Sequence, residues 1–331
     1  VSEDEIPVWQ NWHDESEPVR VGVSACLLGA EVRFDGGHKR DRYVTDILGA
    51  HVEWRPVCPE LEAGLGLPRP AIQLVGGERG DRLVVRGDGE DVTEKMARYA
   101  EPRVAELLEA GLDGFVFKKD SPSCGVFRGR VRPTGDGMPV RTGIGHFSRV
   151  VVDACPDLPV EEEGRLNDAR LREGFIEAIF CHNRWRVLVK RGLTRGSLVA
   201  FHEAHKMLLL AHDEARYRSL GRIVGSFGQV PDEDVYRDYE TDFLAAIRRP
   251  ASVGRHVNVL EHLFGHMKQA LRPREKAEIG VAIQDYRAGR VPLVVPVTLL
   301  RFLVTSHEVD YVGGQLYLEP HPREMMLRNH V

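Results

Sequence analysis

The sequence predicts two structural classes in one chain: an α/β domain with a mostly parallel sheet flanked by helices, and then an all-α domain. The α/β class is predicted by short apolar strands that alternate with helix-length segments, and by turns rich in Gly or Pro that follow these strands. The all-α class is predicted by apolar positions that recur at three- and four-residue steps after residue 164. A chain of 331 residues is long enough for two hydrophobic cores.

The first half begins with an acidic segment, residues 1–18, which we expect to precede the first domain. Alternating polar and apolar residues that end in an apolar run are typical of a buried strand. A proline marks the end of a strand, because it cannot donate a backbone hydrogen bond to the neighbouring strand. A glycine commonly marks the end of a helix. The elements expected on these grounds are a strand at 20–26, a helix at 43–49, a strand at 51–57, a helix at 94–110, a strand at 113–118 and a turn at 121–125.

The second half is expected to contain helices only, separated by Gly or Pro signals. The predicted helices cover residues 166–190, 197–220, 232–248, 252–271, 273–288 and 294–304. The run of three glutamates at 161–163 makes a plausible junction between the domains. We therefore predict that the α/β domain covers residues 19–162 and that the helical domain covers residues 163–331.

Three cysteines lie far apart in the sequence, and each is in a tight turn: Cys26 in the segment 24–29, Cys58 in 56–60 and Cys124 in 121–125. All three fall just beyond the carboxyl ends of predicted strands, where open α/β sheets bind their ligands. Three thiolates brought together by a fold can hold a metal or an iron–sulfur centre and leave one position open for chemistry. The pattern favours a catalytic metal site, and three separate buried cysteines are the alternative.

Other candidate motifs are weaker. The chain has no Cys-x-x-Cys, so neither a zinc ribbon nor a thioredoxin-like redox pair is predicted. Cys155 and Cys181 are expected to be structural. His202 and His205 are three residues apart, which does not match the i, i+4 spacing of a zinc-protease helix.

Charge is distributed unevenly between the two halves. Residues 1–155 carry 20 Lys+Arg and 26 Asp+Glu, whereas residues 156–331 carry 25 and 24. The second half contains a basic segment with aromatic residues nearby, made of Arg184, Arg186, Lys190, Arg191 and Arg195. Such a segment can contact the phosphates of a nucleic acid, and the alternative is a solvated helix face.

The three cysteine motifs together carry a resemblance to a known family. Segments 23–29, 56–60 and 118–125, in that order, resemble the TudS-type thiouracil desulfidases. Segments 201–212, 258–262 and 286–293 resemble the helical domain that is fused to them in the RudS-type, or YbgA-type, proteins. The resemblance covers nearly the whole chain after about residue 20.

The resemblance implies a [4Fe–4S] cluster held by Cys26, Cys58 and Cys124, with one iron that lacks a protein ligand. It also implies Glu60 and Ser121 as the catalytic acid/base residues, and 4-thiouridine in tRNA as the substrate, converted to uridine with loss of sulfide. An open iron can bind a soft thiocarbonyl sulfur and act as a Lewis acid. Glu60 can then activate water, and Ser121 can protonate or hydrogen-bond the ring.

Two other functions remain open from the sequence. One is desulfidation of free thiouracil-type bases, with a helical domain that is structural. The other is a non-catalytic, metal- or cluster-binding protein that binds RNA or senses redox state. A tRNA needs an electrostatic platform across several phosphates, which the basic segment can provide, and an adjacent carboxylate favours an enzyme over a sensor.

We expect a cytoplasmic protein that does not cross a membrane. The longest apolar runs, such as residues 291–300, are too short and too interrupted by proline to span a bilayer. The acidic start lacks the basic and apolar regions of a signal peptide. Five cysteines form an odd set, which argues against a secreted disulfide framework.

Overall fold

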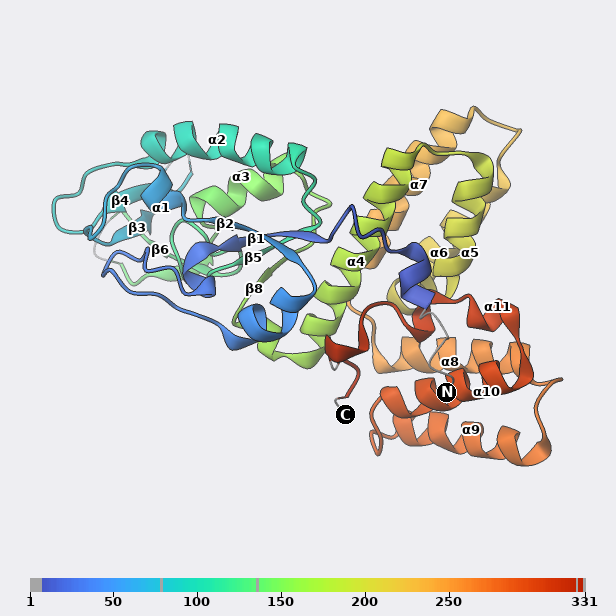
Figure 1. The fold of residues 1–331 in the computed structure, drawn as a ribbon. Coiled ribbons are helices and arrows are strands. Elements are labelled where there is room, and N and C mark those ends of the chain that lie inside the picture. Colours follow the sequence, from blue (N-terminus) through green and yellow to red (C-terminus); the bar gives the residue numbers. More distant parts are fainter. Residues whose placement is uncertain (1–7, 78–79, 135–136, 326, 330–331) are drawn as a thin grey trace. The chain divides into compact units, whose positions relative to one another are not determined.

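The computed structural model describes residues 8–77, 80–134, 137–325 and 327–329, and it divides the chain into two compact units (Figure 1). One unit runs from Pro18 to Asp168, and the other joins the residues up to Glu17 to Ala169–Val331. The predicted acidic segment thus lies partly outside the described residues, at 1–7, and its described part, 8–17, belongs to the helical unit. The predicted combination of an α/β and an all-α fold is confirmed.

The first sheet of the α/β unit has four parallel strands. Their spatial order is β2 (Glu53–Val57), β1 (Arg20–Ser24), β5 (Gly114–Phe117) and β8 (Val160–Glu162). Every residue of β5 is buried, as expected for a strand with both faces covered. Helices α2 (Thr93–Glu109) and α3 (His146–Ala154) pack on the face that carries Phe115 and Phe117 (Figure 1).

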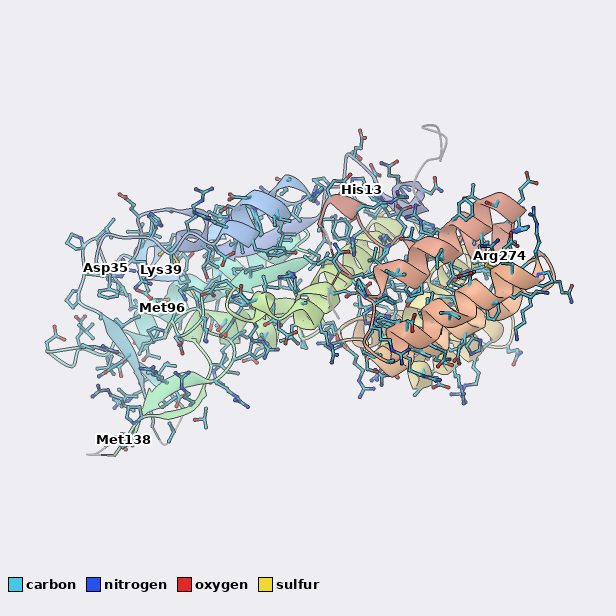
Figure 2. All side chains as sticks on the ribbon, turned by 90° about the horizontal axis from the view of Figure 1, so that it is seen from below. His13, Asp35, Lys39, Met96, Met138 and Arg274 are labelled. Atoms are coloured by element: carbon cyan, nitrogen blue, oxygen red, sulfur yellow. The ribbon has the colours of Figure 1, made fainter. Side chains whose placement is uncertain are left out.

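A second sheet in this unit was not predicted from the sequence. Its order is β4 (Arg82–Val85), β3 (Ile72–Val75), β6 (Gly129–Arg132) and β7 (Val140–Gly143), with parallel pairing only between β3 and β6. Apolar residues of this sheet pack around Met96 of α2, which Figure 2 labels together with Met138 on the β6–β7 connection. Met138 is 86% exposed, so this connection reaches into solvent.

The remaining elements of the α/β unit are short helical turns. The predicted helix at 43–49 forms as a π-helical turn, η3 (Tyr43–Ile47), followed by a 3₁₀ turn, η4 (Leu48–Ala50). Two further turns, η2 (Ala25–Leu28) and α1 (Pro59–Glu62), directly follow β1 and β2. η5 (Arg165–Asn167) precedes the helical unit in the sequence.

The described part of the second unit contains helices and short helical turns. The helices are α4 (Ala169–Arg191), α5 (Arg195–His212), α6 (Glu214–Gly225), α7 (Asp232–Ile247), α8 (Val253–Met267), α9 (Pro273–Arg287), α10 (Val294–His307) and α11 (Asp310–Gly313). The turns are η1 (Val8–Trp12), η6 (Leu316–Leu318) and η7 (Arg323–Met325). No helix in the described residues combines the length and apolar character that a membrane crossing requires.

One predicted helix, at 197–220, is wrong because it is two helices. Asp213 ends α5 and caps α6, since its carboxylate accepts the backbone N–H groups of Ala215 and Arg216. Asp213 also pairs with Arg249 at 2.7 Å, which holds the corner in place. The apolar periodicity continues across this corner, so periodicity alone does not reveal it.

Candidate active site

The three predicted cysteines follow strands that end at the same edge of the parallel sheet. Cys26 lies in η2 after β1, Cys58 precedes α1 after β2, and Cys124 lies in the turn after β5. Strands β2, β1 and β5 are parallel neighbours, and Ser24 pairs with Val57 in the register. The fold therefore brings all three cysteines to one pocket of about 190 Å³.

The thiols influence one another electrostatically. Burial raises the pKa of Cys124 to about 12 and that of Cys26 to about 11, and the neighbouring Cys58 contributes to both increases. Burial also raises the pKa of Cys58. Thiolates in this pocket are therefore costly to form unless a cation binds them.

This donor set fits a multi-atom cluster. In the part of the chain that the structure describes, no three His, Cys, Asp or Glu side chains converge closely enough to hold a metal ion. One water needs about 10–15 Å³ of pocket volume, so the cysteine pocket has room for many atoms. Thiolates are the usual ligands of iron–sulfur clusters, whose several irons allow the ligands to stand apart around the pocket.

Glu60 lies in the same pocket and is held by a buried arginine that the sequence analysis missed. Arg69 donates to Glu60 Oε2 from Nε at 3.0 Å and from Nη2 at 2.6 Å. The Arg69 side chain is only 3% exposed, and it also donates to the carbonyl oxygens of Val32 and Gly66. The carboxylate is therefore fixed in position by a two-pronged ion pair.

The hydroxyls of Ser123 and Ser121 extend this contact into a chain. Ser123 Oγ donates to Glu60 Oε1 at 2.6 Å and lies 3.0 Å from Ser121 Oγ. A hydroxyl has one proton, and that of Ser123 is committed to the carboxylate, so Ser121 is the donor in the second bond. Ser121 Oγ also accepts the backbone N–H of Cys124 at 3.1 Å. A continuous path of hydrogen bonds therefore joins Glu60 to Ser121.

A second carboxylate, Glu62, orders the Cys58 turn. Its Oε1 accepts the backbone N–H of Cys58 at 2.7 Å, and its Oε2 accepts a hydrogen bond from Tyr99. Arg103 lies 3.5 Å from the same oxygen. Helix α2, which carries Tyr99 and Arg103, thus supports one of the three cysteines from outside the pocket.

The turn that carries Ser123 and Cys124 packs closely on Gly145, at the start of α3. The backbone N–H groups of Phe147 and Gly145 donate to the carbonyl oxygens of Ser123 and Gly125 at 2.9 and 2.6 Å. A Cβ atom at Gly145 would lie 2.6 Å from the carbonyl carbon of Ser123 and 2.8 Å from the amide nitrogen of Cys124. Gly145 is therefore the position where a side chain would displace the Cys124 turn.

We expect Gly145→Ala to lower the free energy of unfolding by about 1–3 kcal/mol, as overpacking does. Cluster content should also fall, because Cys124 moves with its turn. Thermal unfolding and iron analysis measure the two effects. Gly76→Ala is the matched control, since a Cβ there meets its nearest neighbour at 3.6 Å. Equal stability and iron content in both variants would contradict the prediction.

The rim of the pocket is predominantly basic. Five Lys or Arg residues and two carboxylates line the pocket. Arg69 binds Glu60, and Lys118 pairs with Glu163 at 2.5 Å. Arg86 and Lys119 are exposed and pair with no carboxylate among the described residues.

An aromatic side chain stands at the same rim. Phe34 is 38% exposed, and the Arg33 guanidinium lies 5.4 Å from its ring centre. Both residues belong to the segment between η2 and η3, on which Figure 2 labels Asp35 and Lys39. The exposed Phe34 ring therefore borders the same pocket as the unpaired cations Arg86 and Lys119.

The residues predicted to bind phosphate are held by acidic partners or buried. Arg184 is 4% exposed and donates to Cys181 and to the carbonyl oxygen of Pro320, so the prediction that it contacts phosphate is wrong. The other four form ion pairs: Arg186 and Lys190 with Glu17, Arg191 with Asp14, and Arg195 with Asp232. Their positive charges are thus partly offset within the helical unit.

The chain thus combines an α/β unit that carries a cysteine-lined pocket at the carboxyl edge of its parallel sheet with a unit of helices. The chain belongs to the 2-thiouracil desulfurase family through residues 21–163 and to a family of unknown function, DUF1722, through residues 206–322.

Two curated relatives each match one part of the chain. The uncharacterized protein YbgA of Escherichia coli (strain K12) is 30% identical over 165 residues, which are 50% of this chain and 98% of YbgA. The uncharacterized protein YbbK of Bacillus subtilis (strain 168) is 34% identical over 130 residues, which are 35% of this chain and 83% of YbbK. The solved structure of the [4Fe-4S]-dependent thiouracil desulfidase TudS is 32% identical, with a TM-score of 0.38, and the match covers 45% of this chain and 94% of that chain.

Proposed function

We propose that this protein is an iron–sulfur-dependent desulfidase that converts 4-thiouridine in tRNA to uridine and releases sulfide. One observation carries the proposal: three cysteines, Glu60 and Ser121 line a single pocket. Membership of the 2-thiouracil desulfurase family supports sulfur removal from a thiolated pyrimidine.

Cys26, Cys58 and Cys124 are the residues that would hold a [4Fe–4S] cluster. When bound, the cluster supplies a coordinatively open iron, a Lewis acid with affinity for the soft sulfur of a thiocarbonyl. The overall reaction is a hydrolysis, in which the thiocarbonyl and one water give a carbonyl and hydrogen sulfide. It needs no net oxidant or reductant.

The protein residues handle the water and its protons. Glu60 is positioned to accept a proton from the attacking water, because Arg69 and Ser123 hold its two oxygens in place. Once Glu60 is protonated, the two hydroxyls can turn to donate in the opposite direction, and the proton can then pass through Ser123 to Ser121. Ser121 can deliver it to the substrate as the carbon–sulfur bond breaks.

The rim of the pocket supports a nucleotide substrate over a free base. A free thiouracil has no phosphate, whereas a nucleotide in RNA has one on each side. Arg86 and Lys119 can contact those phosphates, and Phe34 offers a face on which a neighbouring base can stack. A base drawn into the pocket must leave its stack, which costs a few kcal/mol that such contacts can offset.

The test is an anaerobic assay with the cluster-reconstituted full chain on two substrates, tRNA that contains 4-thiouridine and free thiouracil. We expect 4-thiouridine to disappear and uridine and sulfide to form in equal amounts, as measured by nucleoside analysis and sulfide detection. Activity on the free base should be weaker, because the rim contacts are missing. Unchanged 4-thiouridine together with rapid turnover of thiouracil would establish the free-base reaction instead. No reaction with either substrate would favour a binding or sensing role.

A further inference from the structure

The cysteine pocket has a second carboxylate, Asp120, that takes no part in the proposed reaction. Among the described residues of the pocket lining, the carboxylates are those of Glu60 and Asp120. They lie at different depths, because the Glu60 side chain is 14% exposed and that of Asp120 is 39% exposed. Glu60 is occupied by Arg69 and Ser123, whereas Asp120 stands at the mouth of the pocket. Its carboxylate can therefore meet a part of the substrate that stays near the surface.

The backbone around Asp120 is held in place, which gives its side chain a defined position. Asp120 has a left-handed φ of 57°, a conformation that Asp adopts more readily than most residues. The backbone N–H of Lys118 donates to Ser24 Oγ at 2.9 Å. The backbone N–H of Lys119 donates to Glu163 Oε2 at 2.7 Å. The turn is thus fixed on the side from which it leaves β5, as a group that selects between substrates requires.

One oxygen of the Asp120 carboxylate has a partner in the protein. Arg141 of β7 donates from Nη1 to Asp120 Oδ1 at 3.0 Å. Both side chains are partly exposed, so this pair orients the carboxylate more than it stabilises the fold. The other oxygen, Oδ2, accepts no hydrogen bond from the residues that the structure describes. It is left for a donor on the substrate.

The negative charge of Asp120 limits what it can contact. Arg86 and Lys119 line the same pocket and are the groups proposed to contact phosphates. A carboxylate repels a phosphate, because like charges at close range destabilise a complex. The part of a nucleotide beside Asp120 must therefore be an uncharged hydrogen-bond donor. A thiouridine within RNA offers two such donors, the N–H group of its base and the 2′-hydroxyl of its ribose.

The order of the residues around Asp120 favours the ribose. Exposure rises along the turn: Ser123 is buried and Ser121 is half-buried, whereas Asp120 and Lys119 are exposed. Ser121 is the residue proposed to act on the base, and Lys119 is proposed to contact a phosphate. Asp120 lies between them in the chain, as the ribose of a nucleotide lies between its base and its phosphate.

We propose that Asp120 accepts a hydrogen bond from the ribose 2′-hydroxyl of the target nucleotide and so makes the pocket selective for RNA over DNA. This inference rests on the proposed function, because it takes the substrate to be a nucleotide. It goes further by assigning the choice between ribose and deoxyribose to one carboxylate. A pocket without this contact would treat the two sugars alike.

The test uses Asp120→Gly in the full chain. This substitution removes the carboxylate without straining the backbone, since glycine adopts a positive φ readily. Asp153→Ala is the matched control, because Asp153 is an exposed residue of α3 outside the pocket lining. Two short RNAs of identical sequence compete in one anaerobic reaction with the cluster-reconstituted protein. One contains 4-thiouridine and the other 2′-deoxy-4-thiouridine at the same position, and nucleoside analysis separates the two products.

We expect the wild type and Asp153→Ala to prefer the ribose substrate about tenfold in kcat/KM, as loss of a hydrogen bond to a charged group predicts. Asp120→Gly should bring this ratio close to one. A preference that persists in Asp120→Gly would overturn the inference even if both rates fall, because equal losses indicate a structural role or a contact with the base. Absence of any preference in the wild type would overturn it as well.

A binding measurement separates this inference from the proposed function. Uridine 3′,5′-bisphosphate and its 2′-deoxy form carry both phosphates but no sulfur, so neither can react. We expect the wild type to bind the ribose form about tenfold more tightly in calorimetric titration, and Asp120→Gly to bind the two alike. Tighter binding of the ribose form without any desulfidation would refute the proposed function and leave the ribose contact in place. Desulfidation together with equal binding of the two forms would overturn the ribose contact alone.

Discussion

Replacing Cys124 by alanine is expected to abolish both iron binding and desulfidation. Cys124 lines the pocket with Cys26 and Cys58, so alanine at this position leaves the pocket with two thiols. A site with only two cysteines lacks a ligand for one corner of the cluster. Cys26→Ala and Cys58→Ala should have the same effect. Iron analysis, visible absorption of the anaerobically reconstituted protein and sulfide release measure the result.

Cys155→Ala is the control for these cysteine variants. Cys155 lies at the end of α3, away from the pocket lining, so iron content and activity should stay near wild type. Circular dichroism and thermal unfolding confirm that each variant is folded, since a buried free cysteine otherwise packs as a small hydrophobic residue. Full activity in any one of the three ligand variants would contradict a three-cysteine cluster.

Glu60→Gln is expected to lower the turnover rate by about 10²–10⁴-fold while cluster content is retained. Glutamine has nearly the shape of glutamate but cannot accept the proton of the attacking water. Its one amide oxygen can accept from Arg69 or from Ser123 but not from both, so one of the two contacts that position Glu60 is lost. Single-turnover desulfidation of 4-thiouridine tRNA measures the rate, and iron analysis measures cluster content.

Glu94→Gln is the matched control for the loss of a carboxylate in the same unit. Glu94 lies on α2 with a side chain that is 85% exposed, and its contact with Arg98 at 3.8 Å is on the surface. We expect wild-type turnover from this variant. An unchanged rate in Glu60→Gln would remove Glu60 from the chemistry and leave it a structural role beside Arg69.

Local signals explain why much of the site could be predicted from the sequence. Cys26 and Cys58 follow short strands, and Gly29 and Pro59 mark the turns after these strands, so both turns are visible within a few residues of sequence. The helices of the second half could also be predicted, since periodicity over many residues is a strong signal.

Contacts that depend on the course of the chain could not be predicted. Arg69 follows Pro68 in a segment without a regular pattern, and its bond to Glu60 depends on how that segment returns over α1. The second sheet is built from four-residue strands such as β4 and β6, in which alternation is too short to be distinctive. Arg184 belongs to a basic run in the sequence, but its side chain points into the core, because one helix face is buried regardless of an occasional charge on it.

The cysteine pocket also has a consequence for synthesis of the protein. β1 is paired with β2 on one side and with β5 on the other, so the three ligands meet only after residue 124 has been translated and β5 has joined the sheet. A ribosome-bound chain that ends before this point has at most two of the three cysteines. For the proposed cluster, iron delivery would therefore follow folding of the α/β unit, and the cluster would enter a formed pocket instead of an extended peptide.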